Sequence, residues 1–158
     1  MMTREYSKDN TTVSQKLTAF IHADKKTVFH YLATTDGIST WFPQLSLTEE
    51  EDEQLVLFDM GDGTFEKMKL LDYKTNEHIS YEWASGKIEF TLEEVDDGTQ
   101  LVLSEELPLD FNAIPEDFTG WYVQMNNVKS VAETGASAPI NRENIKEVKT
   151  DIIEQLDL

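Results

Sequence analysis

A long stretch of alternating apolar and polar residues lies between two helical blocks, and this order constrains the fold more than any other feature. The first block, Phe20–Phe42, predicts a strand, a short helix, a turn and a second short helix. The second block, Phe118–Gly135, predicts one long amphipathic helix. The alternation between the blocks is typical of antiparallel strands with one buried face. We therefore expect an α+β protein whose sheet has about six to seven strands.

Start and stop signals locate the two early helices. Asp24 is a good N-cap for a first helix that carries Phe29 and Leu32 on one face. Asp36-Gly37 is the start signal of a second segment, and Pro43 ends that segment because proline has no amide donor. The two short helices therefore follow the first strand directly.

Turn residues divide the middle region into short strands. Gly61-Asp62-Gly63 and Asp96-Asp97-Gly98 each predict a hairpin turn, because glycine adopts positive φ without penalty. The clearest pair of strands is 87–95 with 100–107. Its apolar residues share one face, and they are Ile88, Phe90, Leu92, Leu101 and Leu103. The late helix, with Pro115 in its first turn and Gly135 at its end, is the long helix available to cover that face.

The two ends of the chain differ from the middle. We expect a flexible N-terminus at 1–11, a main domain at 12–135 and an amphipathic helical extension at 136–158. The extension has an apolar stripe formed by Ile145, Val148, Ile152, Ile153 and Leu156. Such a stripe packs against protein rather than water. It docks on its own domain, on a protein partner, or in a homodimer.

Composition excludes several classes of function. The chain has no cysteine, which rules out disulfides, thiolate metal ligands and a cysteine nucleophile. Its net charge of -18 disfavours nucleic acids and anionic membrane surfaces as partners. No apolar run approaches the roughly 20 residues of a membrane span, and no secretory signal is visible. We expect a cytoplasmic protein with no membrane insertion, no metal and no cofactor.

The order of elements resembles the SRPBCC or START-like superfamily. The residues that carry the resemblance are the stretch ADKKTVF at Ala23–Phe29, the pair Trp41-Phe42, Trp83 near the end of a strand, and Gly120-Trp121 in the late helix. The branch it is most similar to is the C-terminal domain of the activator of heat-shock protein 90 ATPase. The resemblance covers roughly 12–135. It implies the helix-grip fold, in which a curved antiparallel sheet wraps around a long C-terminal helix.

The resemblance also implies a cavity between the sheet and the late helix that binds a small hydrophobic or amphipathic molecule. The candidate ligand-binding residues are Trp41, Phe42, Phe58, Met68, Trp83, Phe90, Phe118, Trp121, Tyr122 and Met125. Polar residues within strand patterns are candidates for placed polar groups, and these are His22, Tyr81, Ser104 and Glu106. Large aromatic residues at these spacings are also typical of ordinary core packing.

Two other functions stay open from the sequence. One is a protein-interaction or chaperone-associated module of the ATPase-activator kind, although this chain is too short to contain the additional N-terminal domain of the eukaryotic activator. The other is a cavity enzyme of the cyclase or hydrolase kind, in which an inward-facing carboxylate acts as a general acid or base. The carboxylates considered for that role are Glu66, Glu82, Glu105 and Glu106. No catalytic residue is assigned.

Overall fold

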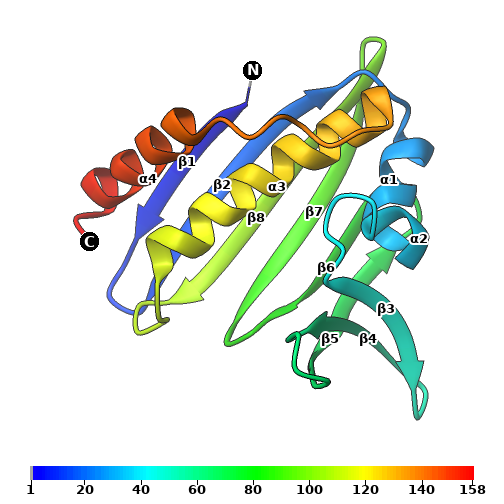
Figure 1. Cartoon of the computed structure of the whole chain (residues 1–158), viewed down its shortest axis with the longest axis horizontal. Helices are drawn as coiled ribbons and strands as arrows, with labels where there is room; N and C mark the ends of the chain where they lie inside the picture. Colours follow the sequence, from blue (N-terminus) through cyan, green and yellow to red (C-terminus); the bar gives the residue numbers. More distant parts are fainter. Residues whose placement is uncertain (1) are drawn as a thin grey trace.

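The computed structural model describes residues 2–158, and it is a single antiparallel sheet covered on one face by helices (Figure 1). The strand order is β1-β2-β8-β7-β6-β5-β4-β3. The strands are β1 (Thr3–Lys8), β2 (Thr12–Ile21), β3 (Leu45–Glu50), β4 (Glu53–Asp59), β5 (Phe65–Lys74), β6 (His78–Trp83), β7 (Gly86–Val95) and β8 (Gly98–Pro108). The expected helix-grip fold is confirmed. The sheet has eight strands, more than the sequence predicted.

The extra strand lies at the N-terminus, where the sequence analysis predicted a flexible segment. That prediction is wrong for residues 3–8, which form β1 and pair antiparallel with β2. The sequence of this segment is polar and charged, so it does not show the alternation that predicts a strand. The reason is that β1 is an edge strand whose side chains are mostly exposed. Its inward-facing residues are Arg4 and Tyr6, opposite Leu17 and Gln15 of β2.

Four helices accompany the sheet: α1 (Lys25–Ala33), α2 (Thr35–Ile38), α3 (Ile114–Thr134) and α4 (Arg142–Leu156). The side chain of Asp24 caps α1 as expected, accepting a hydrogen bond from the amide of Thr27 at 2.8 Å. The second helix is capped by Thr34 rather than Asp36. Gly135 ends α3 with a φ of 84°, which is why a glycine stands there.

The long helix α3 lies across the inward face of the sheet (Figure 1). Its C-terminal half is fixed to the end of β2, because Lys129 Nζ donates to the carbonyl of Phe20 at 2.7 Å and Glu133 accepts from the amide of His22 at 2.8 Å. Beside it, α4 packs against β1 and α3. None of the helices within residues 2–158 is long and apolar enough to cross a membrane.

Strand register arranges the inward side chains in rows that cross the sheet. One row, which we call the apolar row, contains Leu17, Leu103, Phe90 and Ile79 on β2, β8, β7 and β6. The neighbouring row, which we call the polar row, contains Gln15, Glu105, Ile88 and Tyr81 on the same four strands. All eight side chains are buried. The two rows differ by two residues on each strand, which is the spacing that keeps side chains on one face.

Two hydrophobic clusters lie under the helices. The larger one joins α1, α2 and α3 to the sheet and includes both Trp41 and Trp121. The smaller one lies under α4, where Val148, Ile152 and Leu156 pack with Val13 and Phe118. The apolar stripe of the C-terminal tail is therefore largely buried against the same chain.

Candidate functional site

The polar row contains buried polar side chains directly beneath the N-terminal part of α3. Glu105 is 2% exposed, and its Oε1 accepts a hydrogen bond from Gln15 Nε2 at 2.8 Å. The same nitrogen donates to the carbonyl of Phe118 at 3.3 Å. Gln15 therefore links the sheet to α3. Such placement follows from alternation along β2 and β8, since Gln15 lies between Val13 and Leu17 on the inward face.

Burial controls the protonation of Glu105. Removal from water disfavours the carboxylate and raises the pKa of Glu105 well above its ordinary value. The neighbouring Asp117 raises this pKa further through a hydrogen bond and its negative charge, while the bond from Gln15 lowers it. Two carboxyl groups that lie together in the interior share a proton more easily than they both ionise. Burial and the neighbouring carboxyl group thus both favour the protonated form of Glu105.

The first turns of α3 supply the other polar groups. Asp117 Oδ2 accepts a hydrogen bond from Trp83 Nε1 at 2.9 Å. Trp121 follows Asp117 by four residues, so both side chains leave the same face of α3. The indole of Trp121 is 2% exposed and lies 4.9 Å from the ring of Trp83, measured between centroids. The helix therefore presents a carboxylate and an indole to the sheet.

Without a proton on Glu105, five buried side-chain atoms of this region among residues 2–158 have no hydrogen-bond partner. They are Gln15 Oε1, Tyr81 Oη, Glu105 Oε2, Asp117 Oδ1 and Trp121 Nε1. Each unsatisfied group costs about 1–3 kcal/mol of stability. They belong to one row of the sheet and to the helical turns that cover it. Their concentration in one region marks a place where the chain keeps polar groups available at the expense of stability.

An aromatic cluster adjoins the polar row. Phe42 contacts Phe58, Trp83 and Trp121, with ring centroids between 5.5 and 6.2 Å apart. Phe90 lies 6.0 Å from Trp121, and Trp41 lies 6.0 Å from Phe42. The structure thus brings together six of the ten sequence-predicted ligand-binding residues: Trp41, Phe42, Phe58, Trp83, Phe90 and Trp121.

The other four predicted residues have different surroundings. Met68 and Met125 are buried in the larger hydrophobic cluster. Phe118 lies in the smaller cluster, where its ring stacks on Tyr6 at 6.3 Å. Tyr122 borders both clusters and donates a hydrogen bond to Asn144 of α4 at 2.8 Å. Phe118 and Tyr122 therefore contribute to the docking of β1 and α4.

The sequence located only part of the polar site. Of its polar candidates, Tyr81 faces inward, whereas His22, Ser104 and Glu106 are exposed. Of the four carboxylates, Glu105 alone is buried. The alternation along β8 could have identified Glu105. It is separated by an even number of residues from Leu101, Leu103 and Leu107, so its side chain lies on the same inward face as these leucines.

Gln15 was not among the residues predicted from the sequence. It lies midway between the apolar residues Val13 and Leu17 on β2, and this alternation places it on the inward face as well. Asp117 was also missed. It is a charged residue in a first helical turn, where an acidic residue is expected for helix stability alone.

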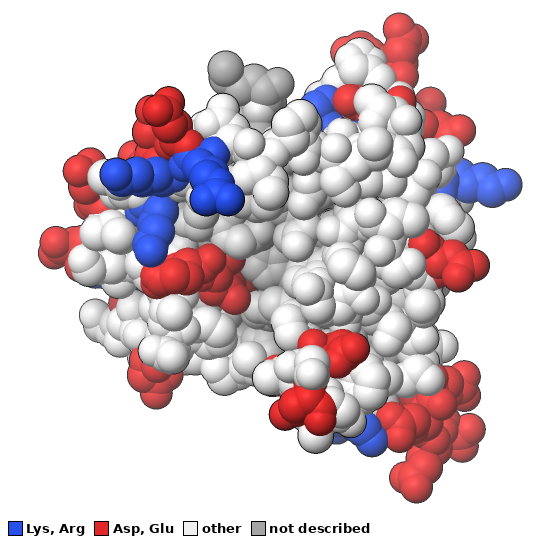
Figure 2. All heavy atoms as spheres, viewed as in Figure 1, with Lys and Arg blue, Asp and Glu red and all other residues white. Residues whose placement is uncertain are grey.

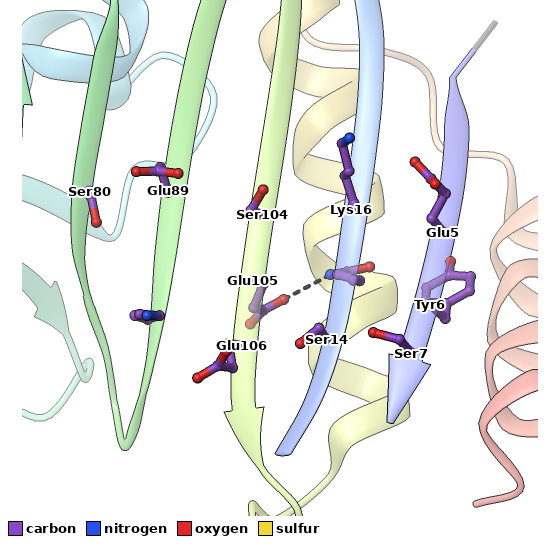
Figure 3. Close-up of a pocket in the computed structure, with 12 residues that line it drawn as sticks. Glu5, Tyr6, Ser7, Ser14, Lys16, Ser80, Glu89, Ser104, Glu105 and Glu106 are labelled. Carbon is purple, nitrogen blue, oxygen red and sulfur yellow. Dashed lines mark hydrogen bonds between the residues drawn. The ribbon is translucent and has the colours of Figure 1, made fainter. Parts of the chain in front are cut away.

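The outer face of the sheet has a hollow of different character. It has a volume of about 460 Å³, and its lining includes Ser14, Lys16, Ser104 and Glu106. Figure 3 shows these side chains on β2 and β8, with α3 behind the sheet and the Gln15–Glu105 hydrogen bond marked. The lining consists mainly of hydroxyl groups and charges of both signs, with Tyr6 as its one aromatic residue. It does not match an apolar ligand.

Within residues 2–158 no group of three His, Cys, Asp or Glu side chains is arranged to hold a metal ion. Glu105 and Asp117 are two carboxyl groups, and their other neighbours are an amide and indoles. What this arrangement offers chemically is hydrogen bonding and proton donation within an apolar surrounding.

Solved structures with this fold come from several bacteria. A conserved protein of unknown function from Enterococcus faecalis matches with a TM-score of 0.84 and 29% identity, over 96% of this chain and 89% of that chain. The protein named Aha1, a dimer from Colwellia psychrerythraea, matches with a TM-score of 0.63 and 18% identity, over 77% and 97%. CalU16 from Micromonospora echinospora matches with a TM-score of 0.70 and 14% identity, over 99% and 95%.

These likenesses show that the chain shares its fold with these proteins, and they do not select one branch of proteins with that fold. The sequence matches no protein-family model, and no curated protein matches it.

Proposed function

We propose that this chain binds a small hydrophobic or amphipathic molecule between the sheet and α3. The observation that carries the proposal is the group of five unpartnered polar atoms beside the aromatic cluster. Ligand sites of this kind are mostly apolar and contain a few placed polar groups. The aromatic rings supply the apolar wall, and the polar row supplies the groups that orient the ligand.

Entry to the site requires side chains to move, because seven of the ten candidate residues are buried. The other three, Phe58, Trp83 and Tyr122, are half-buried. The face that carries α3 is hollowed near its centre, and most of its charged side chains lie toward the edge (Figure 2). An apolar molecule therefore meets a largely uncharged surface near the centre of this face.

The test is native mass spectrometry or calorimetry with a panel of lipids and aromatic metabolites. The chain offers a matched pair of variants, since Glu105 faces inward and Glu106 faces outward on the same strand. We expect Glu105→Gln to weaken binding of a ligand found in the panel about tenfold or more, because an amide replaces the buried carboxyl group and changes the hydrogen bonds offered to the ligand. Glu106→Gln should leave binding unchanged. Absence of any bound ligand, or an equal effect of both variants, contradicts the proposal.

A second candidate function is acid–base chemistry on the bound molecule. It is favoured by the raised pKa of Glu105, which burial and Asp117 together cause. A buried carboxyl group with a raised pKa is a better proton donor at the pH of the reaction than an ordinary one, which is already ionised. In an NMR titration we expect the side-chain carboxyl carbon of Glu105 to titrate well above the ordinary glutamate value of 4.5. A midpoint at the ordinary value would remove the support for this function.

The protein-interaction alternative has less support. The tail helix α4 buries Val148, Ile152 and Leu156 against its own chain, so little of the stripe is free for a partner. A homodimer through the tail predicts that removal of residues 136–158 changes the oligomeric state measured by light scattering. An unchanged oligomeric state would exclude a role of the tail in dimerisation.

A further inference from the structure

We infer that the polar group of the ligand is an uncharged or cationic hydrogen-bond donor, a hydroxyl or an amine, and not a carboxylate. This inference rests on the proposed function and deepens it. It concerns the charges around the polar row and the balance of donors and acceptors there.

Charge is the first argument. The site contains the carboxyl groups of Glu105 and Asp117, one buried and one half-buried. Among residues 2–158, neither of them forms an ion pair with a lysine or arginine. The nearest charged pair along α3 is Lys149 with Glu116 at 3.4 Å, and there the lysine is already paired. Arg4 faces inward beside the rings of Tyr6 and Tyr122, and it is already paired with Asp151 at 2.9 Å. An anionic ligand would thus add a negative charge where these neighbouring cations are already paired, in surroundings where charges are weakly screened.

The unpartnered atoms are the second argument. Three of the five are acceptors, namely Gln15 Oε1, Glu105 Oε2 and Asp117 Oδ1. Trp121 Nε1 is a donor, and the hydroxyl of Tyr81 serves either way. When protonated Glu105 donates to Asp117, the oxygen atoms of both carboxyl groups are satisfied, and Gln15 Oε1 is the remaining unpartnered atom that only accepts. A hydroxyl or an amine donates to Gln15 Oε1, whereas a carboxylate has no proton to donate and leaves that oxygen unsatisfied.

The orientation of Gln15 supports this count. Its Nε2 donates both to Glu105 Oε1 at 2.8 Å and to the carbonyl of Phe118 at 3.3 Å. The carbonyl of Phe118 is an acceptor whatever the protonation of Glu105, so it fixes which end of the amide faces α3. Oε1 of Gln15 is therefore the atom left for a ligand.

The experiment compares probes that share a body and differ in the polar group. Naphthylmethanol, naphthylmethylamine and naphthoate form one set, and decanol, decylamine and decanoate form another. Each is titrated at pH 7 into the full chain, with calorimetry and the fluorescence of the three tryptophans as readouts. We expect the alcohol or the amine of a set to bind about tenfold or more tightly than its carboxylate, a difference of about 1.4 kcal/mol. In Glu105→Gln this preference should shrink, and in Glu106→Gln it should persist.

The outcomes separate the two proposals. A carboxylate that binds as tightly as its alcohol and amine overturns the inference while it supports a ligand site. The same holds if the preference is unchanged in Glu105→Gln. If no member of either set binds and the wider panel is also negative, the proposed function fails and this inference fails with it.

Discussion

The apolar row and the polar row are neighbours on the same four strands, yet they bury side chains of different chemistry. In the apolar row, Leu17 and Leu103 are 0% exposed and Phe90 is 1% exposed, and none of these side chains has a polar atom. In the polar row, Gln15 and Glu105 are each 2% exposed and Tyr81 is 1% exposed. Burial is therefore the same in both rows, and only the chemistry differs.

The energetic consequences are opposite. Burial of an apolar side chain contributes about 1.5–3 kcal/mol to folding. Burial of an unsatisfied polar group costs about 1–3 kcal/mol. Three of the five unpartnered atoms belong to the polar row, and the other two belong to α3 above it. One row stabilises the fold, and its neighbour reduces that stability.

This difference agrees with the ligand site that we propose at the polar row. Sites that bind ligands commonly retain groups that a sequence chosen for stability alone would replace. A leucine at residue 105, in the polar row, would keep the alternation along β8. The chain has glutamate there instead. Substitutions in the two rows should therefore change stability in opposite directions.

The largest effect is expected in the apolar row. Leu103→Ala removes a fully buried side chain that lies between Leu17 and Phe90. We expect a loss of about 2–5 kcal/mol in the free energy of unfolding, because the removed methyl groups leave a cavity. Urea denaturation measures it. Ser104→Ala, on the exposed face of the same strand, should stay within about 0.5 kcal/mol. Equal losses in the two variants would show that the row is not the core of the fold.

The apolar row and the covering helix were predictable from the sequence, because alternation and helical spacing report burial directly. Ile88, Phe90, Leu101 and Leu103 were assigned to one face, and that face is inward in the structure. Pro115 and Gly135 marked the ends of α3 for local reasons of backbone geometry. These features depend on neighbours along the chain and so leave a local signal.

The polar row was harder to predict because a polar residue in a strand is ordinarily assigned to the solvent face. Glu105 lies beside Glu106 in the sequence, and only the parity of the leucines on β8 separates them. The proximity of Asp117 to Glu105 depends on how α3 crosses the sheet, which no local pattern reports. The pairing of β1 with β2 likewise depends on an edge strand whose residues are mostly polar.

A second prediction concerns pH and the polar row. The folded-state pKa of Glu105 is raised above its ordinary value of 4.5, so the folded protein binds this proton more tightly than the unfolded chain does. The contribution of Glu105 to wild-type stability should therefore fall as pH rises from about 4.5 through the raised folded-state pKa. Glu105→Gln lacks this proton, and its advantage over wild type should grow by up to about 1.4 kcal/mol per pH unit in that window.

The other carboxyl groups contribute equally to wild type and to Glu105→Gln. Their contribution therefore cancels when the two free energies of unfolding are subtracted. Several of these groups, such as Asp24 and Asp62, have a lowered pKa, so their contribution to stability increases as pH rises. Urea denaturation at a series of pH values measures the difference. Parallel stability curves for the two proteins would mean that Glu105 is not perturbed by burial.

The smallest effect is expected for Tyr81→Phe. The hydroxyl of Tyr81 is buried without a partner, and burial together with the charge of Glu105 raises the pKa of this phenol. Removal of the oxygen keeps the ring, which lies 6.5 Å from that of Phe90. We expect a gain of about 1 kcal/mol in the free energy of unfolding, because an unsatisfied polar atom leaves the interior. Thermal denaturation followed by circular dichroism measures it.

A loss of stability in Tyr81→Phe would mean that the hydroxyl is hydrogen-bonded in solution, by water or by a neighbour in the polar row. The control is Tyr73→Phe. Tyr73 is 45% exposed, so its hydroxyl should have little influence on stability. If Tyr81→Phe gains stability and also binds the probe alcohols more weakly, the polar row exchanges stability for binding, as its contrast with the apolar row indicates.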